Sequence, residues 1–290
     1  MESWDRRAKV ALLSIASNFT LIILKIFAGI LSGSVSIISE AIHSGMDLIA
    51  SIIAFFSVRQ SAKPADKEHP YGHGKIENFS GLVEGLLIFI AAGMIITEAI
   101  KKIIEPTEIE QGTVAIVVMI VASIVNLLVS KKLYRVAKEE DSMALEADAL
   151  HLKTDVYTSL GVAVGLVLIE VTGLHILDPI VAILVALLII KEAWDLCKNA
   201  FDALMDSRLS DEEETKIKTI INSHSDKFLD FHKLKTRKSG NIKHIDFHIT
   251  VDANLTAVEI HDIIGSLKKE MREELNHTRV NIHVDPYIKK

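Results

Sequence analysis

Cysteine is almost absent from this chain of 290 residues, in which Cys197 is the only one. A single cysteine excludes an intrachain disulfide and a cluster of thiolate ligands within one chain, so we interpret Cys197 as a packing residue. The sequence has no Walker motif, and Gly72-His73-Gly74 lacks the flanking strand and the lysine-serine or lysine-threonine step of a phosphate loop. It also has no HExxH pair, the signature of one class of zinc enzyme. These absences argue against an ATP-driven pump and against a metalloenzyme.

Hydrophobic residues are abundant but unevenly placed. They make up 49% of the chain, whereas 24% of the residues are charged and the net charge is -6. From Val10 to about Ala200 the sequence divides into apolar segments of roughly the length that crosses ~30 Å of hydrocarbon as a helix. From Asp206 onward it is charged and amphipathic. The sequence therefore predicts an α-helical membrane protein, with a six-helix transmembrane bundle over residues 1–205 and a cytoplasmic domain over residues 206–290. The spans are expected near residues 10–31, 36–58, 79–100, 112–133, 146–170 and 176–198.

Lysine and arginine gather in alternate loops of this predicted bundle. They precede the first span and lie between spans two and three and between spans four and five, whereas the opposite loops contain chiefly acidic residues. Lys101 and Lys102 are the discordant pair. Because basic residues in short loops favour the cytoplasmic side, we expect both termini in the cytoplasm. No cleavable signal is apparent, and the short chain suits a bacterial inner membrane.

Two segments with the same spacing of histidine and aspartate lie inside predicted spans. His43 and Asp47 belong to the second span, and His151 and Asp155 belong to the fifth. An ionisable residue at membrane depth costs about +2.5 to +3.5 kcal/mol to insert and therefore indicates function. Residues i and i+4 share a helix face, so two facing helices can bring two imidazoles and two carboxylates to a tetrahedral point that suits a zinc-like cation. The alternative is that each His/Asp pair only forms hydrogen bonds inside a polar bundle. The occurrence of two identical pairs favours the metal site over this alternative.

The cytoplasmic segment has the pattern of a small two-layer α/β domain. An acidic first turn opens an amphipathic helix over Asp211 to His224. Two alternating strands follow, joined by a turn at Ser239-Gly240-Asn241. A second helix over Thr256 to Leu275 begins with a capping pattern, and Arg279 to Val284 is expected to be a third strand. The predicted element order is αββαβ.

Histidine is frequent in this domain. Strand alternation places His244 and His248 on one exposed face, and His283 on the same side as Asp285. Two interpretations remain open: scattered surface histidines that raise solubility, or a cytoplasmic metal centre that acts as a sensor or allosteric site.

The loop between spans two and three contains another group of possible ligands. Asp66, His69 and His73 lie among prolines and glycines that can fold them together. A polar turn without a metal is an equally good interpretation of this loop.

These features together resemble the cation diffusion facilitator family. They are the six spans, the paired motifs in spans two and five, the His69-Pro70-Tyr71-Gly72-His73-Gly74-Lys75 loop and the αββαβ tail. The likeness covers essentially the full chain and is greatest to the bacterial zinc and iron efflux branch. It implies a homodimer of proton-coupled antiporters, joined through metallochaperone-like tails into a Y- or V-shaped assembly, that exports divalent metal from the cytoplasm. It implies neither an enzyme nor a user of ATP or nucleic acid.

The resemblance also implies roles by position. A tetrahedral transport site is implied at His43, Asp47, His151 and Asp155, and a second site at Asp66, His69 and His73. A binuclear site that stabilises the dimer is implied at His232, His248, His261, His283 and Asp285. Lys75 and Asp206 correspond to a charge pair that interlocks protomers, and Leu150 corresponds to a hydrophobic gate. Many bacterial iron and zinc members have aspartate where this chain has His43, a combination associated with zinc and cadmium, so Zn²⁺ is favoured over iron.

Ligand chemistry connects such a site to protons. Histidine, with a reference pKa of about 6.5, must be neutral to bind metal, so a proton and a cation compete for one nitrogen. The expected mechanism is alternating access around a fixed site, with zinc favoured and cadmium, iron, cobalt and manganese as alternatives. The rival functions are a non-transporting membrane sensor or assembly partner, and a passive channel. A tight four-ligand site would hold an ion too strongly for fast conduction.

Overall fold

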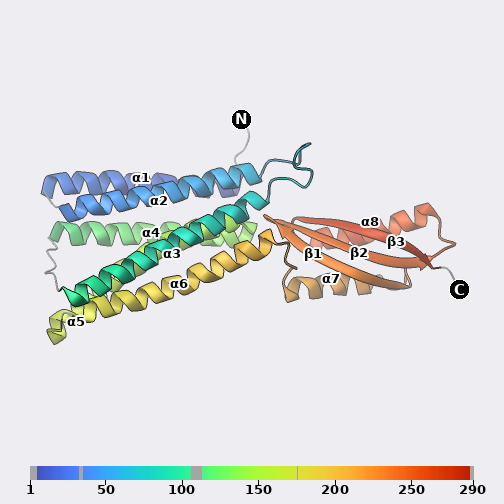
Figure 1. Cartoon of the computed structure of the whole chain (residues 1–290). Helices are drawn as coiled ribbons and strands as arrows, with labels where there is room; N and C mark the ends of the chain where they lie inside the picture. Colours follow the sequence, from blue (N-terminus) through green and yellow to red (C-terminus); the bar gives the residue numbers. More distant parts are fainter. Residues whose placement is uncertain (1–4, 33–34, 106–112, 175, 288–290) are drawn as a thin grey trace. The chain divides into compact units, whose positions relative to one another are not determined.

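The computed structural model describes residues 5–32, 35–105, 113–174 and 176–287. Side chains at positions 29, 31–32, 35–43, 46, 113–116, 162–167, 169–170 and 178 lie outside that description. The chain divides into two compact units, Met1–Phe201 and Asp202–Lys290. The first unit is helical, and the second combines helices with a sheet (Figure 1).

Long helices build the first unit. They are α1 (Arg6–Ser32), α2 (Val35–Ser61), α3 (Lys75–Ile104), α4 (Thr113–Glu140), α5 (Met143–Thr172) and α6 (Leu177–Leu204), whose last residues extend into the second unit. Within the described residues, three stretches are long and apolar enough to cross a membrane: Arg6–Ala28, Lys75–Ile104 and Val117–Glu140. The structure thus contains the expected helices, and the number that span the membrane stays a prediction. Charged residues such as Lys153 in α5 and Lys191 in α6 interrupt the apolar runs of the other helices.

Small residues allow these helices to approach closely. One buried cluster combines Ile88 and Ala92 of α3 with Ala147 of α5 and Ala193 of α6. Gly85 in α3 is needed at this contact, because a Cβ atom built there would lie 2.4 Å from the Sγ atom of Cys197 in α6. Cys197 is buried, as expected of a packing residue.

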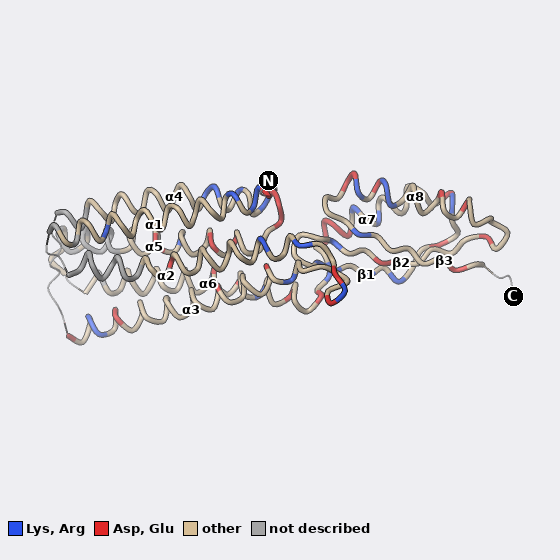
Figure 2. The backbone as a smooth tube through the Cα atoms, turned by 90° about the horizontal axis from the view of Figure 1, so that it is seen from above, with Lys and Arg blue, Asp and Glu red and all other residues tan. Residues whose placement is uncertain are grey.

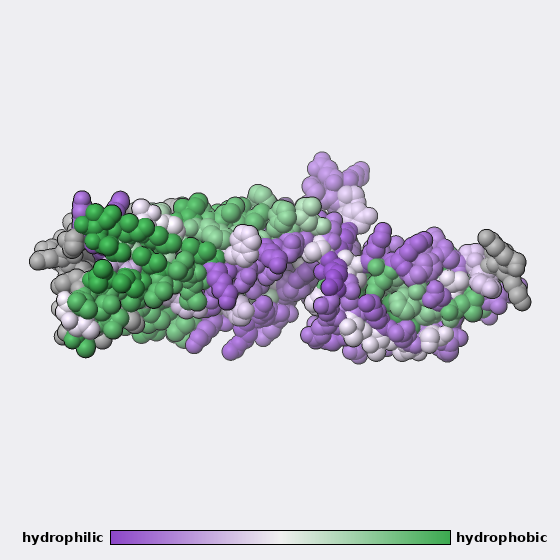
Figure 3. Space-filling view, turned by 60° about the horizontal axis from the view of Figure 1, so that its bottom comes forward, coloured by the Kyte–Doolittle hydropathy of each residue, from purple (hydrophilic) through white to green (hydrophobic). Residues whose placement is uncertain are grey.

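The outside of the helical unit is strongly apolar. Large hydrophobic side chains such as Phe27, Phe56, Leu128 and Leu184 are each more than half exposed. They belong to a broad hydrophobic surface on the helices, part of which Figure 3 shows in green. The charged residues of this unit gather mainly at the end where α1 begins (Figure 2). A soluble monomer rarely exposes an apolar surface of this extent, so lipid is its natural surrounding.

The second unit has the predicted order of elements. It contains α7 (Asp211–Ser223), β1 (Asp230–Ser239), β2 (Ile242–Asp252), α8 (Ala257–Glu274) and β3 (Thr278–Tyr287). Both helices begin with a capping box, in which Ser210 and Thr256 exchange hydrogen bonds with the glutamate three residues later. The sheet order is β1-β2-β3, with β1 antiparallel and β3 parallel to β2.

One face of this sheet forms the core and the other presents polar residues. Ile245, Phe247 and Ile249 of β2 are buried in one cluster with residues of α7 and α8. The intervening residues of β2 point to the opposite face. There the register aligns His248 with His232 on one side and with His283 on the other. The strand pairing therefore gathers three histidines from distant parts of the sequence.

Candidate metal sites

The structure brings one residue from each HxxxD motif into contact. Asp47 of α2 lies with its Oδ1 atom 3.1 Å from the Nε2 atom of His151 in α5. The Asp47 side chain is 5% exposed and that of His151 is 14% exposed. Asp155 follows His151 by one helical turn on the same face. The backbone of His43 belongs to α2, but its side chain lies outside the described part of the structure, so its role stays a prediction.

Polar residues from neighbouring helices support this pair. The Asn18 amide of α1 donates to the Ser51 hydroxyl over 2.7 Å and lies 3.4 Å from the Asp47 carbonyl. The Ser51 hydroxyl in turn lies 3.0 Å from a carboxylate oxygen of Asp148. Asn126 of α4 donates from Nδ2 to Asp155 Oδ2 over 3.3 Å. The sequence alone did not point to Asn18, Ser51 or Asn126, although polar residues inside apolar spans were the available signal.

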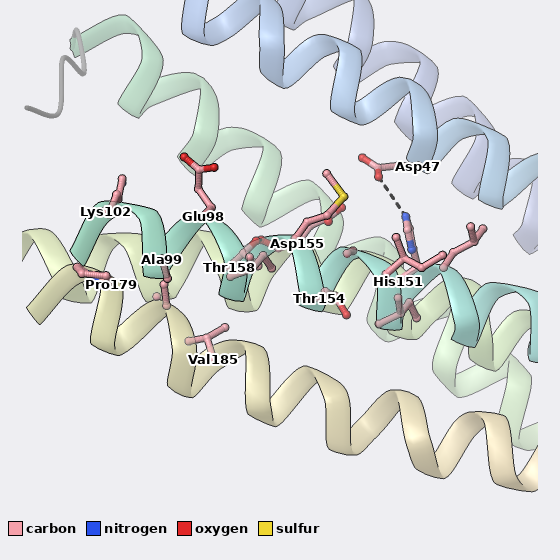
Figure 4. A pocket seen from close by; sticks show the side chains of 18 residues that line it. Asp47, Glu98, Ala99, Lys102, His151, Thr154, Asp155, Thr158, Pro179 and Val185 are labelled. Carbon is pink, nitrogen blue, oxygen red and sulfur yellow. Dashed lines mark hydrogen bonds and ion pairs between the residues drawn. The ribbon is translucent and has the colours of Figure 1, made fainter. Parts of the chain in front are cut away.

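A cavity of about 610 Å³ is lined by residues of both motifs. Its wall includes Asp47, His151 and Asp155, and it extends along α3 and α6 toward Glu98 and Pro179 (Figure 4). Most other lining residues are apolar side chains of α3 and α6. In the predicted topology, the end of α3 and the start of α6 face away from the cytoplasm. The cavity thus extends from the ligand candidates along α3 and α6 to Glu98 and Pro179.

A buried ion pair lies at the opposite end of the helical unit. Arg7 of α1 lies with Nη1 2.6 Å from Glu77 Oε1 at the start of α3. Ser61 at the end of α2 donates to the same carboxylate over 2.6 Å, and Ser142 before α5 donates to its other oxygen. Glu77 has 0% exposure. These contacts join four helices at the end where α3 begins.

The loop between α2 and α3 gathers its three predicted ligands. Asp66 lies 3.3 Å from His69 Nδ1 and 3.3 Å from His73 Nε2, and the two imidazole rings are 4.4 Å apart. One ligand atom from each residue lies within 4.8 Å of the others. The backbone N–H of His69, which donates to Asp66 over 2.7 Å, lowers the pKa of the Asp66 carboxyl. An ionised carboxylate beside two imidazoles is a suitable set of metal ligands.

The tail forms a second cluster of this kind. His232, His248 and Asp285 each offer a ligand atom within 4.8 Å of the others. Asp285 Oδ2 lies 2.9 Å from His248 Nδ1 and 3.2 Å from His232 Nε2. His283 Nε2 lies 3.3 Å from the other Asp285 oxygen. The hydrogen bond from His248 lowers the pKa of Asp285. His261 lies exposed on α8, and no hydrogen bond or ion pair of the described residues joins it to this group.

One tail histidine differs from the expectation. His244 was expected on an exposed strand face, but it is 6% exposed. It lies between Arg237 of β1 and Arg279 of β3 in the sheet register. Burial, followed by the charges of the two arginines, lowers the pKa of His244.

Asp206, Lys75 and Leu150 are the remaining residues with predicted roles. Asp206 forms an ion pair with Arg237 over 3.2 Å. Its predicted pairing with Lys75 was between protomers and stays a prediction. Leu150 packs against the cluster shared by α3, α5 and α6, and its role as a gate is likewise a prediction.

Comparisons with known proteins cover both units. A family described as "Cation efflux transmembrane domain" matches residues 11–205, and one described as "Cation efflux protein, cytoplasmic domain" matches residues 209–287. The chain is 36% identical over 276 residues to the "Uncharacterized transporter sll1263" of Synechocystis. This alignment covers 95% of this chain and 89% of that protein. It is 33% identical to the "Cation-efflux pump FieF" of Shewanella oneidensis, and the alignment covers 98% of this chain and 94% of that protein. It is 29% identical to the "Manganese efflux system protein MneP" of Bacillus subtilis, with 97% of each covered.

Proposed function

Because the chain belongs to the cation efflux family, we propose that it exports divalent metal cations, with zinc preferred, in exchange for protons. Membership of this family, also called the cation diffusion facilitator family, confirms the resemblance inferred from the sequence. It makes the chain a membrane protein that moves metal cations rather than an enzyme. The choice of metal, the proton coupling and the route are the proposal.

The observation that carries the proposal is the contact between Asp47 and His151. These residues are separated by 104 positions, yet their side chains lie 3.1 Å apart at a cavity wall. A carboxylate and an imidazole at membrane depth are costly unless they have a function. We propose that His43 and Asp155 complete a four-ligand site with them.

Alternating access is supported by the two ends of the helical unit. The cavity extends from the ligand candidates toward Glu98 and Pro179. At the other end, Arg7 and Glu77 form a buried ion pair where helices converge. A site open to one side and closed to the other suits a release state, and we propose that loading from the cytoplasm requires the reverse arrangement.

Proton exchange follows from the ligand set. An imidazole binds metal only when neutral, so a metal that reaches His151 or His43 displaces any proton there. On the more acidic side of the membrane, protonation would release the metal. Two histidines and two aspartates form a neutral complex with a divalent ion, and this mixed nitrogen and oxygen set suits zinc in tetrahedral geometry. Named relatives include a manganese efflux protein, so selectivity needs its own test.

The proposal extends to assembly and regulation. We propose a homodimer in an inner membrane with both termini in the cytoplasm, in which metal at the tail cluster links the protomers. The match to a family cytoplasmic domain over residues 209–287 supports a shared arrangement of the tails. The loop cluster of Asp66, His69 and His73 is proposed as a further metal site.

The test is zinc flux into proteoliposomes under an imposed pH gradient, with lumenal pH recorded at the same time. Wild-type protein should move zinc with counterflow of protons, and Asp155→Ala should abolish both. Asp195→Ala, which removes an exposed carboxylate of α6 that is not among the cavity-lining residues, is the matched control and should retain flux. Wild-type protein that binds zinc but moves none would favour the sensor or assembly partner instead.

A further inference from the structure

Asn126 of α4 combines a contact to a proposed ligand with an unsatisfied buried atom. The residue is 7% exposed. Its Nδ2 atom donates to Asp155 Oδ2 over 3.3 Å. Its Oδ1 atom is buried and has no hydrogen-bond partner among the described residues. A buried polar atom without a partner costs free energy and calls for an explanation.

The orientation of the Asn126 amide follows from the Asp155 carboxylate, which can only accept hydrogen bonds when it is ionised. If the amide were reversed, its oxygen would face a carboxylate oxygen, and two acceptors would oppose each other. The N–H therefore points to Asp155, and the unsatisfied oxygen points away from that carboxylate. An apolar residue of similar shape would avoid this cost, so fold stability does not explain why asparagine occupies the position.

The contact restricts how Asp155 can bind a metal. The N–H of Asn126 occupies one lone-pair direction of Oδ2, which disfavours binding of a metal by both oxygens and favours Oδ1 as the ligand atom. One oxygen per carboxylate suits a four-coordinate zinc ion. Larger, harder cations take more oxygen ligands and often bind both oxygens of a carboxylate. The contact thus favours metal ions of low coordination number, such as zinc, over ions that take more oxygen ligands.

We propose that Asn126 is a positioning residue that holds Asp155 as a single-oxygen ligand and thereby favours zinc over manganese. This inference rests on the proposed function, because it assigns selectivity to the same transport site. Asn126 acts through Asp155 and is not among the residues that line the cavity. Partners that orient a ligand typically change metal affinity or activity by about 10- to 100-fold when they are removed.

The neighbouring turn of α4 supplies a matched control. Ser130 is also buried, and its hydroxyl donates to the Ala149 carbonyl of α5 over 2.7 Å. Ser130→Ala removes a hydrogen bond between the same two helices without touching a proposed ligand. A general loosening of α4 against α5 would therefore affect this variant as well.

The experiment measures zinc and manganese flux into proteoliposomes under one pH gradient, for wild type, Asn126→Leu, Asn126→Asp and Ser130→Ala. Half-saturating concentrations and maximal rates are determined for each metal, and thermal unfolding is recorded in detergent. Asn126→Leu should raise the half-saturating zinc concentration at least about tenfold, with a smaller effect on manganese, while the unfolding temperature stays equal or rises. Asn126→Asp, which loses the donor when ionised, should also lower the zinc-to-manganese ratio.

The outcomes separate the inference from the function on which it rests. Loss of zinc preference in both Asn126 variants but not in Ser130→Ala supports the inference. An unchanged zinc-to-manganese ratio in either Asn126 variant, or an equal change in Ser130→Ala, overturns it while transport stands. Wild-type protein that moves neither metal refutes the proposed function and the inference together.

Discussion

Removing the charge of Glu77 should destabilise the helical unit far more than removing an exposed charge. Glu77 is fully buried and accepts from Arg7 over 2.6 Å and from Ser61 over 2.6 Å, with Ser142 on its other oxygen. The perturbation is Glu77→Gln, which keeps the shape and removes the charge. Arg7, whose side chain is 8% exposed, then remains buried with Asp5 as its acidic partner in the described ion pairs.

The size of the stability loss follows from the guanidinium of Arg7, which stays buried without the charge of Glu77. Breaking a buried ion pair from one side costs about 3–5 kcal/mol, because the other charge is left uncompensated. Asp5 still lies 2.6 Å from Arg7, and a glutamine oxygen can still accept hydrogen bonds, so we expect the lower end, about 3 kcal/mol. The double variant Arg7→Met/Glu77→Gln should cost less than the sum of the single changes, because neither charge is then left alone.

Thermal unfolding in detergent measures this effect, with Glu146→Gln as the control. Glu146 pairs with Lys138 over 3.1 Å, but the two side chains are 29% and 57% exposed. Exposed pairs contribute about 0–1 kcal/mol, so this variant should unfold close to wild type. If Glu77→Gln is no less stable than Glu146→Gln, or if the Arg7 and Glu77 changes are additive, the buried pair does not hold the helices together.

Two further changes test other parts of the structure. Gly85→Ala should lower the unfolding temperature, because its Cβ would lie 2.4 Å from the Cys197 sulfur and overpacking costs about 1–3 kcal/mol. Adding Cys197→Ala to this variant should restore stability. An unchanged unfolding temperature in Gly85→Ala would refute the close approach. The backbone N–H of Thr256 lowers the pKa of Glu259 below 4.5, so its stabilisation is present above pH 4.5 and is lost as the pH falls through the lower folded value. Glu259→Gln should therefore reduce thermal stability at pH 7 but make little difference below that range, whereas an equal loss at both pH values would contradict this sign.

Local patterns in the sequence were enough to predict most elements. An acidic first turn from Asp211 and a capping pattern at Thr256 marked the helix starts, and alternation in β2 separated the Ile245 face from the His248 face. These signals act over a few residues, and the structure follows them. The spacing of four between His151 and Asp155 likewise fixed a shared helix face.

Contacts between distant residues could not be obtained in this way. Nothing local relates Arg7 to Glu77, which are 70 residues apart, or Asn126 to Asp155, which are 29 apart. The position of His244 between Arg237 and Arg279 depends on the register of two neighbouring strands, and a single strand pattern does not contain that register. Such contacts require the packing of whole elements, and the resemblance implied only the residues that the family motifs mark.

Different helices contribute the ligands, their supports and the cavity wall, and this arrangement gives the proposed transport a physical basis. The proposed ligands belong to α2 and α5, and their hydrogen-bonding supports come from α1 through Asn18 and from α4 through Asn126. Helices α3 and α6 supply much of the cavity wall, largely with apolar side chains, and meet through Gly85 and Cys197. Apolar contacts have little directional preference, whereas the hydrogen bonds around Asp47 and Asp155 need fixed geometry. A change in access can therefore alter the packing of α3 and α6 while the geometry of the ligands is kept.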